Sequence, residues 1–196
     1  MDLIISSNNK NKIKEINDLL SDLNINLLSL SDINFNLDIE ETGTTFEENS
    51  YIKASTIEST YHKATIADDS GLCVEALNGA PGVYSHRFAG VECDDTKNNL
   101  KLVEVLKNEK KRNAKFVSVI CYINNGVVKY AKGEISGVII DTPRGNNGFG
   151  YDPYFFIPSL NKTMAELTLT EKNKISHRAL ALKALKEIIY EDINNK

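Results

Sequence analysis

The chain has 196 residues, of which 41% are hydrophobic and 26% charged, and it carries a formal net charge of −4. These values are typical of a globular protein with a sizeable core and exclude an intrinsically disordered chain. The acidic balance argues against a nucleic-acid partner, because binding to phosphate backbones usually requires a basic surface. It permits a nucleotide ligand whose charge a metal ion neutralises.

Targeting and redox signals indicate a cytoplasmic protein. No uncharged run approaches the length that spans a bilayer, so we expect no membrane partner. The first residues lead directly into a strand-like run and lack the features of a signal peptide. The three cysteines, Cys73, Cys93 and Cys121, are an odd number without CxxC spacing, which is typical of buried thiols in a reducing compartment.

Predicted strands and helices alternate in the first part of the chain. Short apolar runs indicate buried strands, and Asn9 is placed to cap the helix that follows it. Thr44 and Thr45 each stand three residues before a glutamate, which is the spacing of a capping box. The predicted elements are a strand at 3–6, a helix at 10–21, a strand at 25–30 and a helix that begins after residue 45.

The remainder of the chain adds strands, a hairpin and a final helix. A buried strand is predicted to end in the acids Asp68 and Asp69, with Gly71 allowing a sharp turn after them. Asn125-Gly126 is a typical hairpin turn. The predicted elements are a strand at 64–68, a helix from Asp94 or Asp95 to Leu106, strands at 115–123 and 127–141, and a helix from Ser176 to about Ile193. This order predicts an α/β fold with a mixed sheet, in one domain over residues 1–196.

The first polar cluster, at residues 6–12, lies between a predicted strand and a predicted helix. Backbone N–H groups at such a junction favour an anion, and Ser7, Asn9 and Lys12 add donors and a positive charge. The loop lacks the glycines of a Walker motif. Taken alone, an ordinary polar turn is the favoured interpretation.

A second cluster surrounds the start of the helix after residue 45. Glu41 precedes the cap and is placed to reach a metal ion, whereas Glu47 and Glu48 are typical partners of the helix dipole. Asn49 and Lys53 are four residues apart and share a helix face. A lysine at the edge of an apolar face more often extends toward solvent than acts in catalysis.

The third cluster is the adjacent pair Asp68 and Asp69, followed by Ser70. Neighbouring carboxylates repel each other unless a cation neutralises them. Their hard oxygens suit Mg²⁺, and ligand sites gather where strands of α/β sheets end. A functional interpretation is therefore favoured over a solvated turn.

The fourth cluster is glycine-rich and covers residues 145–153, with cations later in the chain. Phe149, flanked by Gly148 and Gly150, is placed to stack on a base, and Asp152 can accept hydrogen bonds from ring N–H groups. The cations are Lys172, His177 and Arg178. The last two fall in the first turn of the final predicted helix, where they oppose the helix dipole, which suggests a role other than stability.

Taken together, the clusters resemble the inosine triphosphate pyrophosphatase family, also called the Ham1-like family. Their joint order and spacing are highly specific, although each alone is weak. One departure is Asn8, where the family usually has glycine; asparagine tolerates positive φ better than most residues. The matching motifs are Ser-x-Asn-x-x-Lys at 7–12, Glu-Glu-Thr-Gly-x-Thr-Phe-x-Glu-Asn at 40–49 with Lys53, Ala-Asp-Asp-Ser-Gly-Leu at 67–72, Gly-Ala-Pro-Gly-Val-Tyr-Ser at 79–85, Gly-Phe-Gly-Tyr-Asp-Pro at 148–153 and Ser-His-Arg at 176–178.

The resemblance implies Mg²⁺-dependent hydrolysis of deaminated purine nucleoside triphosphates, with Mn²⁺ as a possible substitute metal. It implies a homodimer of two-lobed subunits with the active site in a cleft between the lobes. Arg178 and His177 would favour keto bases, so Arg178→Ala is expected to lose base selectivity more than metal binding. The implied residues are Asp69, Lys12, Lys53 and Asp68 for catalysis, with Asp69 as general base; Glu41 and Asp69 for the metal; and Ser7, Asn9, Lys12, Asn49, Lys53, Ser70, Phe149, Gly150, Tyr151, Asp152, Lys172, His177 and Arg178 for the substrate.

Two alternatives remain open. A related house-cleaning pyrophosphatase would act on other modified nucleotides. A substrate panel would distinguish it from an enzyme specific for deaminated purine nucleotides. A non-catalytic nucleotide-binding protein would bind inosine triphosphate and leave it intact. The adjacent carboxylates argue against this last alternative, because they are costly to hold together without a purpose.

Overall fold

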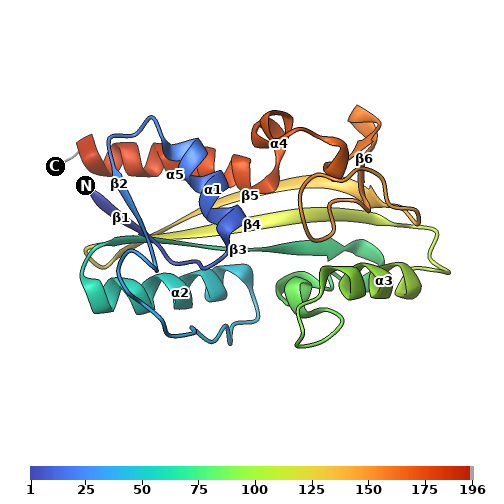
Figure 1. Ribbon diagram of the computed structural model, residues 1–196, viewed down its shortest axis with the longest axis horizontal. Helices are drawn as coiled ribbons and strands as arrows, with labels where there is room; N and C mark the ends of the chain where they lie inside the picture. The colour runs from blue at the N-terminus through green and yellow to red at the C-terminus, as the bar shows by residue number, and fades with distance from the viewer. Residues whose placement is uncertain (195–196) are drawn as a thin grey trace. The chain divides into compact units, whose positions relative to one another are not determined.

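The computed structural model describes residues 1–194 and contains one mixed β-sheet with helices packed against it (Figure 1). The strand order is β2-β1-β3-β4-β5-β6-β7. Strand β1 pairs in parallel with both β2 and β3, whereas β6 pairs antiparallel with β5 and β7. The strands are β1 (Asp2–Ile5), β2 (Asn26–Ser29), β3 (Ala64–Val74), β4 (Asn113–Asn124), β5 (Val127–Ile139), β6 (Phe155–Ile157) and β7 (Lys162–Thr163).

Five α-helices occur in the described chain, and their start signals are local. Asn9 accepts a hydrogen bond at its Oδ1 from the Lys12 N–H at 3.2 Å, and Asp94 accepts one from the Lys97 N–H at 3.0 Å. Thr45 and Glu48 form a complete capping box. The helices are α1 (Lys10–Leu20), α2 (Phe46–Tyr61), α3 (Asp95–Val105), α4 (Leu169–Ile175) and α5 (His177–Asn194). Of these, α4 was not predicted.

The chain forms two compact units. Unit 1 contains Met1–Asp69, Ser118–Gly133 and, of the described residues, 178–194; unit 2 contains Ser70–Val117 and Glu134–His177. The α/β class and mixed sheet predicted from the sequence are confirmed. The single domain and the cleft between lobes stay predictions.

In unit 1, alternate residues of each strand pack on opposite faces of the sheet. Leu3, Ile5 and Ile66 join one core cluster with α1 and α5, whereas Ile4 and Ala67 pack on the face covered by α2 (Figure 1). This alternation is the period of two that every strand imposes on its side chains. It decides which face each of the two acids of β3 reaches.

The core of unit 2 is a separate hydrophobic cluster. It contains Leu72 and Val74 of β3, Leu102 of α3 and Phe155 of β6, all fully buried. Within residues 1–194, no helix is both long and apolar enough to cross a membrane.

Strand β3 corrects one prediction. The sequence predicted that it ends at Asp68 and that Gly71 turns the chain, but the strand continues to Val74. The reason is that Leu72 and Val74 are buried in the core of unit 2, so the apolar pattern resumes after the acids. Asp68 and Asp69 therefore lie within a strand, where they cannot share one face.

Candidate functional site

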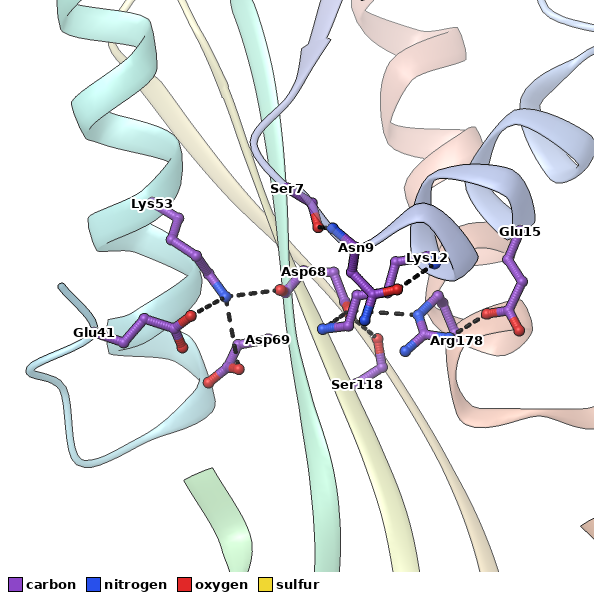
Figure 2. Close-up of polar contacts among 10 residues, drawn as sticks. All are labelled: Ser7, Asn9, Lys12, Glu15, Glu41, Lys53, Asp68, Asp69, Ser118 and Arg178. Atoms are coloured by element: carbon purple, nitrogen blue, oxygen red, sulfur yellow. Dashed lines mark hydrogen bonds and ion pairs between the residues drawn. The ribbon is translucent and has the colours of Figure 1, made fainter. Parts of the chain in front are cut away.

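The loop after β1 is held in a compact turn that leads into α1. The Ser6 N–H donates to the carbonyl of Ile66 at 2.8 Å, and the Asn9 N–H donates to the Ser7 Oγ at 3.2 Å. The polar side chains Ser7, Asn9 and Lys12 thus lie together at the N-terminus of α1, as Figure 2 shows. Such a junction favours an anion, because free N–H groups and the helix dipole point toward it.

Asp68 lies on the α1 and α5 face of β3, among cations. The Lys12 Nζ is 2.7 Å from the Asp68 Oδ2, and the Arg178 Nε is 3.4 Å from the same oxygen (Figure 2). Ser118 of β4 donates its hydroxyl to the Oδ1. Burial raises the pKa of Asp68, but the charges of Lys12 and Arg178 outweigh burial and hold the pKa well below its usual value. Asp68 is therefore ionised at all physiological pH values.

Arg178 joins two carboxylates in the interior of unit 1. Its side chain is only 2% exposed, and a second guanidinium nitrogen pairs with Glu15 of α1. Burial alone would lower the pKa of Arg178, but Asp68 and Glu15 raise it above its usual value. Burial lowers the pKa of Lys12, although Asp68 opposes this effect. The pairs connect α1, β3 and α5 through one buried charge network.

Asp69 lies on the opposite face of β3, beside α2. The Lys53 Nζ is 3.7 Å from the Asp69 Oδ1, 3.2 Å from the Glu41 Oε1 and 2.9 Å from the Asp68 carbonyl oxygen, to which it donates (Figure 2). Burial raises the pKa of Asp69 to about 6, with Glu41 and Asp68 acting in the same direction and Lys53 against them. A carboxylate whose pKa lies near neutrality can take up and release a proton at physiological pH.

The segment that carries Glu41 is fastened to the first turn of α2. The Glu48 carboxylate accepts from the N–H groups of Thr44 and Thr45, at 2.6 Å and 3.1 Å, and from the Thr44 hydroxyl. The Asn49 Oδ1 accepts from the Gly43 N–H at 2.8 Å. Asn49 is fully buried. Since α2 also carries Lys53 one turn further on, these bonds set the spacing between Glu41 and Lys53.

Replacing Gly43 with alanine is expected to lower the free energy of unfolding by about 1–3 kcal/mol, the usual cost of overpacking. A Cβ there would lie 2.6 Å from the Glu48 Cβ and 2.7 Å from the Asn49 Oδ1. Urea denaturation measures the loss. The double variant Gly43→Ala/Asn49→Ala is the control, since removing the Asn49 amide relieves one contact and the two losses should not add. Strictly additive losses would show that the new Cβ does not clash with the Asn49 Oδ1.

The predicted base-reading residues other than Arg178 belong to unit 2. The Lys172 Nζ is 3.0 Å from the Asp152 Oδ2 and lies over the Phe149 ring, 4.8 Å from its centroid. The same Asp152 oxygen accepts from the Phe149 N–H at 3.0 Å. His177 stacks on the Phe116 ring with centroids 4.9 Å apart. The buried Tyr151 donates its hydroxyl to the Ser85 carbonyl at 2.7 Å.

Two carboxylates of the described chain, Glu41 and Asp69, converge on the Lys53 ammonium group. Within residues 1–194 no group of three or more His, Cys, Asp or Glu side chains could hold a metal ion. An oxygen-only pair formed by Glu41 and Asp69 fits Mg²⁺, which proteins typically bind through one or two carboxylates plus oxygens of the substrate phosphates. The donor set therefore fits the metal that the sequence predicts.

Comparison with known proteins decides the family. The model of the Ham1 family matches residues 3–188. The chain belongs to the Ham1 family. Its relatives include proteins named dITP/XTP pyrophosphatase from Clostridium perfringens, 49% identical over 195 residues with 94% of this chain and 95% of the relative covered, and from Thermoanaerobacter pseudethanolicus, 45% identical over 198 residues with 100% of both covered.

Solved structures of Ham1 proteins share the fold. The Ham1 protein of Staphylococcus aureus aligns with a TM-score of 0.91 and 42% identity, covering 98% of this chain and 100% of that one. A HAM1 protein from Coxiella burnetii aligns with a TM-score of 0.92 and 41% identity, covering 97% and 99%. The family resemblance derived from the motifs is therefore confirmed.

The Ham1 motifs and the geometry agree on which residues meet in unit 1, but two partners were missed. Glu15 and Ser118 were not predicted, although both bond to the network around Asp68. Glu15 stands three residues after Lys12 and so shares its helix face, a signal that was available. Ser118 carried no signal, since it is one polar residue in a buried strand. Arg178, predicted to read the base, lies with the phosphate-binding candidates and is paired with Asp68 and Glu15.

Proposed function

We propose that this Ham1 protein hydrolyses deaminated purine nucleoside triphosphates, namely ITP, dITP and XTP, to the monophosphate and pyrophosphate, and so removes them from the nucleotide pool. The names of two relatives that match this chain over nearly their whole length, both dITP/XTP pyrophosphatases, support this assignment. The observation that carries it is Asp69, a buried carboxylate beside Lys53 and Glu41 with a pKa raised to about 6. A base with this pKa can accept a proton from water that attacks the α-phosphorus.

The charges of unit 1 fit a triphosphate. Ser7, Asn9 and the N-terminus of α1 offer hydrogen-bond donors, and Lys12 and Lys53 offer positive charge on the two sides of β3. Phosphoryl chemistry requires mainly positioning and cancellation of developing charge. In this proposal Ser7, Asn9 and Lys12 hold the phosphate chain, and Lys53 neutralises charge beside the proton acceptor Asp69.

We propose that Glu41 and Asp69 hold Mg²⁺, for which Mn²⁺ could substitute. When bound, the ion supplies charge neutralisation at the phosphates and acidifies water. The Lys53 ammonium group lies within ion-pair distance of both carboxylates and limits their repulsion. The reaction is therefore expected to stop when EDTA removes the ion.

Base selectivity is proposed to rest on hydrogen-bond polarity in unit 2. Inosine and xanthosine carry an accepting oxygen at position 6, where adenine carries a donating amino group. Lys172, and His177 when it is protonated, can only donate, and Phe149 offers a ring face for stacking. Sites built on such bonds discriminate by about 10⁴–10⁵ against a base that leaves their polar groups unpaired.

A substrate panel tests the function. Pyrophosphate release is measured from the triphosphates of inosine, xanthosine, guanosine, adenosine and cytidine, with Mg²⁺ and with EDTA. We expect fast release from inosine and xanthosine triphosphates only, and only with the metal. Release from other modified nucleotides would favour a different house-cleaning substrate, and binding of inosine triphosphate without release would favour a non-catalytic binding protein.

We further propose a homodimer, as the family resemblance implies. Support comes from a hollow of about 610 Å³ in unit 2, whose apolar lining includes the half-buried Val138 and the exposed Pro158. Exposed apolar surface of this kind often marks a protein interface. Light scattering measures the mass in solution, and a monomer at all concentrations would contradict the proposal.

A further inference from the structure

Both backbone polar groups of Gly150 are hydrogen-bonded to helix α3. Its N–H donates to the Asp95 Oδ2 at 2.9 Å, and its carbonyl accepts from the Asn99 Nδ2 at 2.9 Å. Asp95 and Asn99 are four residues apart on α3, so they share a helix face. Gly150 has a φ of 61°, a conformation that side chains disfavour. Side chains of α3 therefore hold the glycine-rich loop by hydrogen bonds to the loop backbone.

These hydrogen bonds also constrain Phe149, the residue that the proposed function assigns to base stacking. Gly150 follows Phe149 directly, and the Phe149 N–H is bonded to Asp152 at 3.0 Å. The ring of Phe149 lies under the Lys172 ammonium group, which is itself bonded to Asp152. Both peptide groups of Phe149 are thus anchored, one by Asp152 and one by α3. The direction of the ring depends on both anchors.

Asn99 is a costly residue for the interior of a helix. Asparagine is a poor helix former, because its side chain competes for backbone hydrogen bonds. Asn99 is 7% exposed, and its Oδ1 has no hydrogen-bond partner among residues 1–194. An unsatisfied buried acceptor lowers stability. The stability of the helix does not explain an asparagine at this position, whereas the hydrogen bond to Gly150 does.

We propose that Asp95 and Asn99 are positioning residues for base recognition, and that they hold the two peptide groups on either side of the Gly150 Cα so that the neighbouring Phe149 ring is fixed for a purine. This inference rests on the proposed function, because it assigns the stacking partner to that reaction. Neither residue touches the charge network of unit 1. They should therefore affect binding of the base and leave binding of the phosphate chain unchanged.

The test compares ligands with and without a base. For Asn99→Leu, Asp95→Ala and the double variant, we measure kcat and KM for dITP, and the inhibition constants of dIMP and of inorganic tripolyphosphate. Loss of both hydrogen bonds should raise the KM for dITP and the inhibition constant of dIMP about tenfold. The inhibition constant of tripolyphosphate should stay within about twofold, and kcat should change little. Asp95→Asn, which keeps an acceptor oxygen, should restore most of the affinity for dIMP.

The matched control is Asn98→Leu. Asn98 is also buried on α3, but it bonds to the His86 carbonyl at 2.9 Å and the Ala89 N–H at 2.7 Å. Replacing Asn98 should lower the melting temperature, but it should not weaken the binding of dIMP more than the binding of tripolyphosphate. An unchanged inhibition constant of dIMP in the folded double variant would overturn the inference. An equal loss of affinity for dIMP and for tripolyphosphate would overturn it as well. A wild-type protein that binds dIMP but releases no pyrophosphate from dITP would instead contradict the proposed function.

Discussion

Replacing Asp69 with asparagine is expected to slow pyrophosphate release from dITP by about 100- to 10,000-fold, the usual contribution of a general base. Asparagine has nearly the same shape, but it cannot take a proton from water. Steady-state rates at saturating dITP and Mg²⁺ measure the loss. A variant that keeps more than a tenth of the wild-type kcat would show that Asp69 is not the proton acceptor.

The same substitution should stabilise the metal-free protein above pH 6. Burial raises the pKa of Asp69 from 3.8 to about 6, so the folded state holds the proton more tightly than the unfolded state. The ionised carboxylate therefore destabilises the fold above pH 6, and this penalty disappears as the pH falls through 6 to below 4. At about 1.4 kcal/mol for each pKa unit, the gain at pH 8 is about 3 kcal/mol. Thermal unfolding in EDTA at pH 8 and pH 4 measures it.

Asp68→Asn is the matched control, because it makes the same change at the adjacent position. The cations around Asp68 hold its pKa below the usual value, so its charge stabilises the folded state at pH 8. That stability is lost as the pH falls through the pKa of the unfolded chain and then of the folded protein. The two substitutions should therefore change the melting temperature in opposite directions at pH 8. A shift in the same direction would contradict the assignment of the two environments.

Replacing Arg178 with alanine is expected to lower the free energy of unfolding by about 3–5 kcal/mol at pH 7. The substitution leaves Glu15 and Asp68 buried without the guanidinium that joins them. Urea denaturation at pH 7 measures the loss. A loss below about 1 kcal/mol at pH 7 would show that water or Lys12 replaces the guanidinium.

A second variant separates lost pairing from lost packing. Arg178→Leu/Glu15→Leu removes two partners of the network together, and Lys12 remains to pair with Asp68. Replacing a buried ion pair with apolar groups is often neutral, so this double variant should be more stable than Arg178→Ala. The keto-purine selectivity of folded Arg178→Lys, measured as the ratio of rates for dITP and dATP, tests the base-reading role predicted from the sequence. A ratio equal to that of the wild type would restrict Arg178 to the charge network.

The sequence by itself determined the elements whose signals are local. The cap at Asn9, the box of Thr45 with Glu48, the cap at Asp94 and the turn at Asn125-Gly126 each involve residues within four positions of one another. Such bonds form wherever the chain goes, because short loops cost little entropy to close. The order of the motifs also indicated the family, which the comparisons confirmed.

Only the tertiary structure decided which partners each of the two acids of β3 has. The continuation of β3 to Val74 depends on burial in unit 2, which no local pattern reveals. Within the strand, the period of two sends Asp68 toward Lys12 and Arg178 and sends Asp69 toward Lys53. The partners of Arg178 lie 110 and 163 residues away along the chain, so their meeting depends on the sheet order and helix packing. Buried charges select their partners by proximity in space, since isolated charges cannot be buried without them.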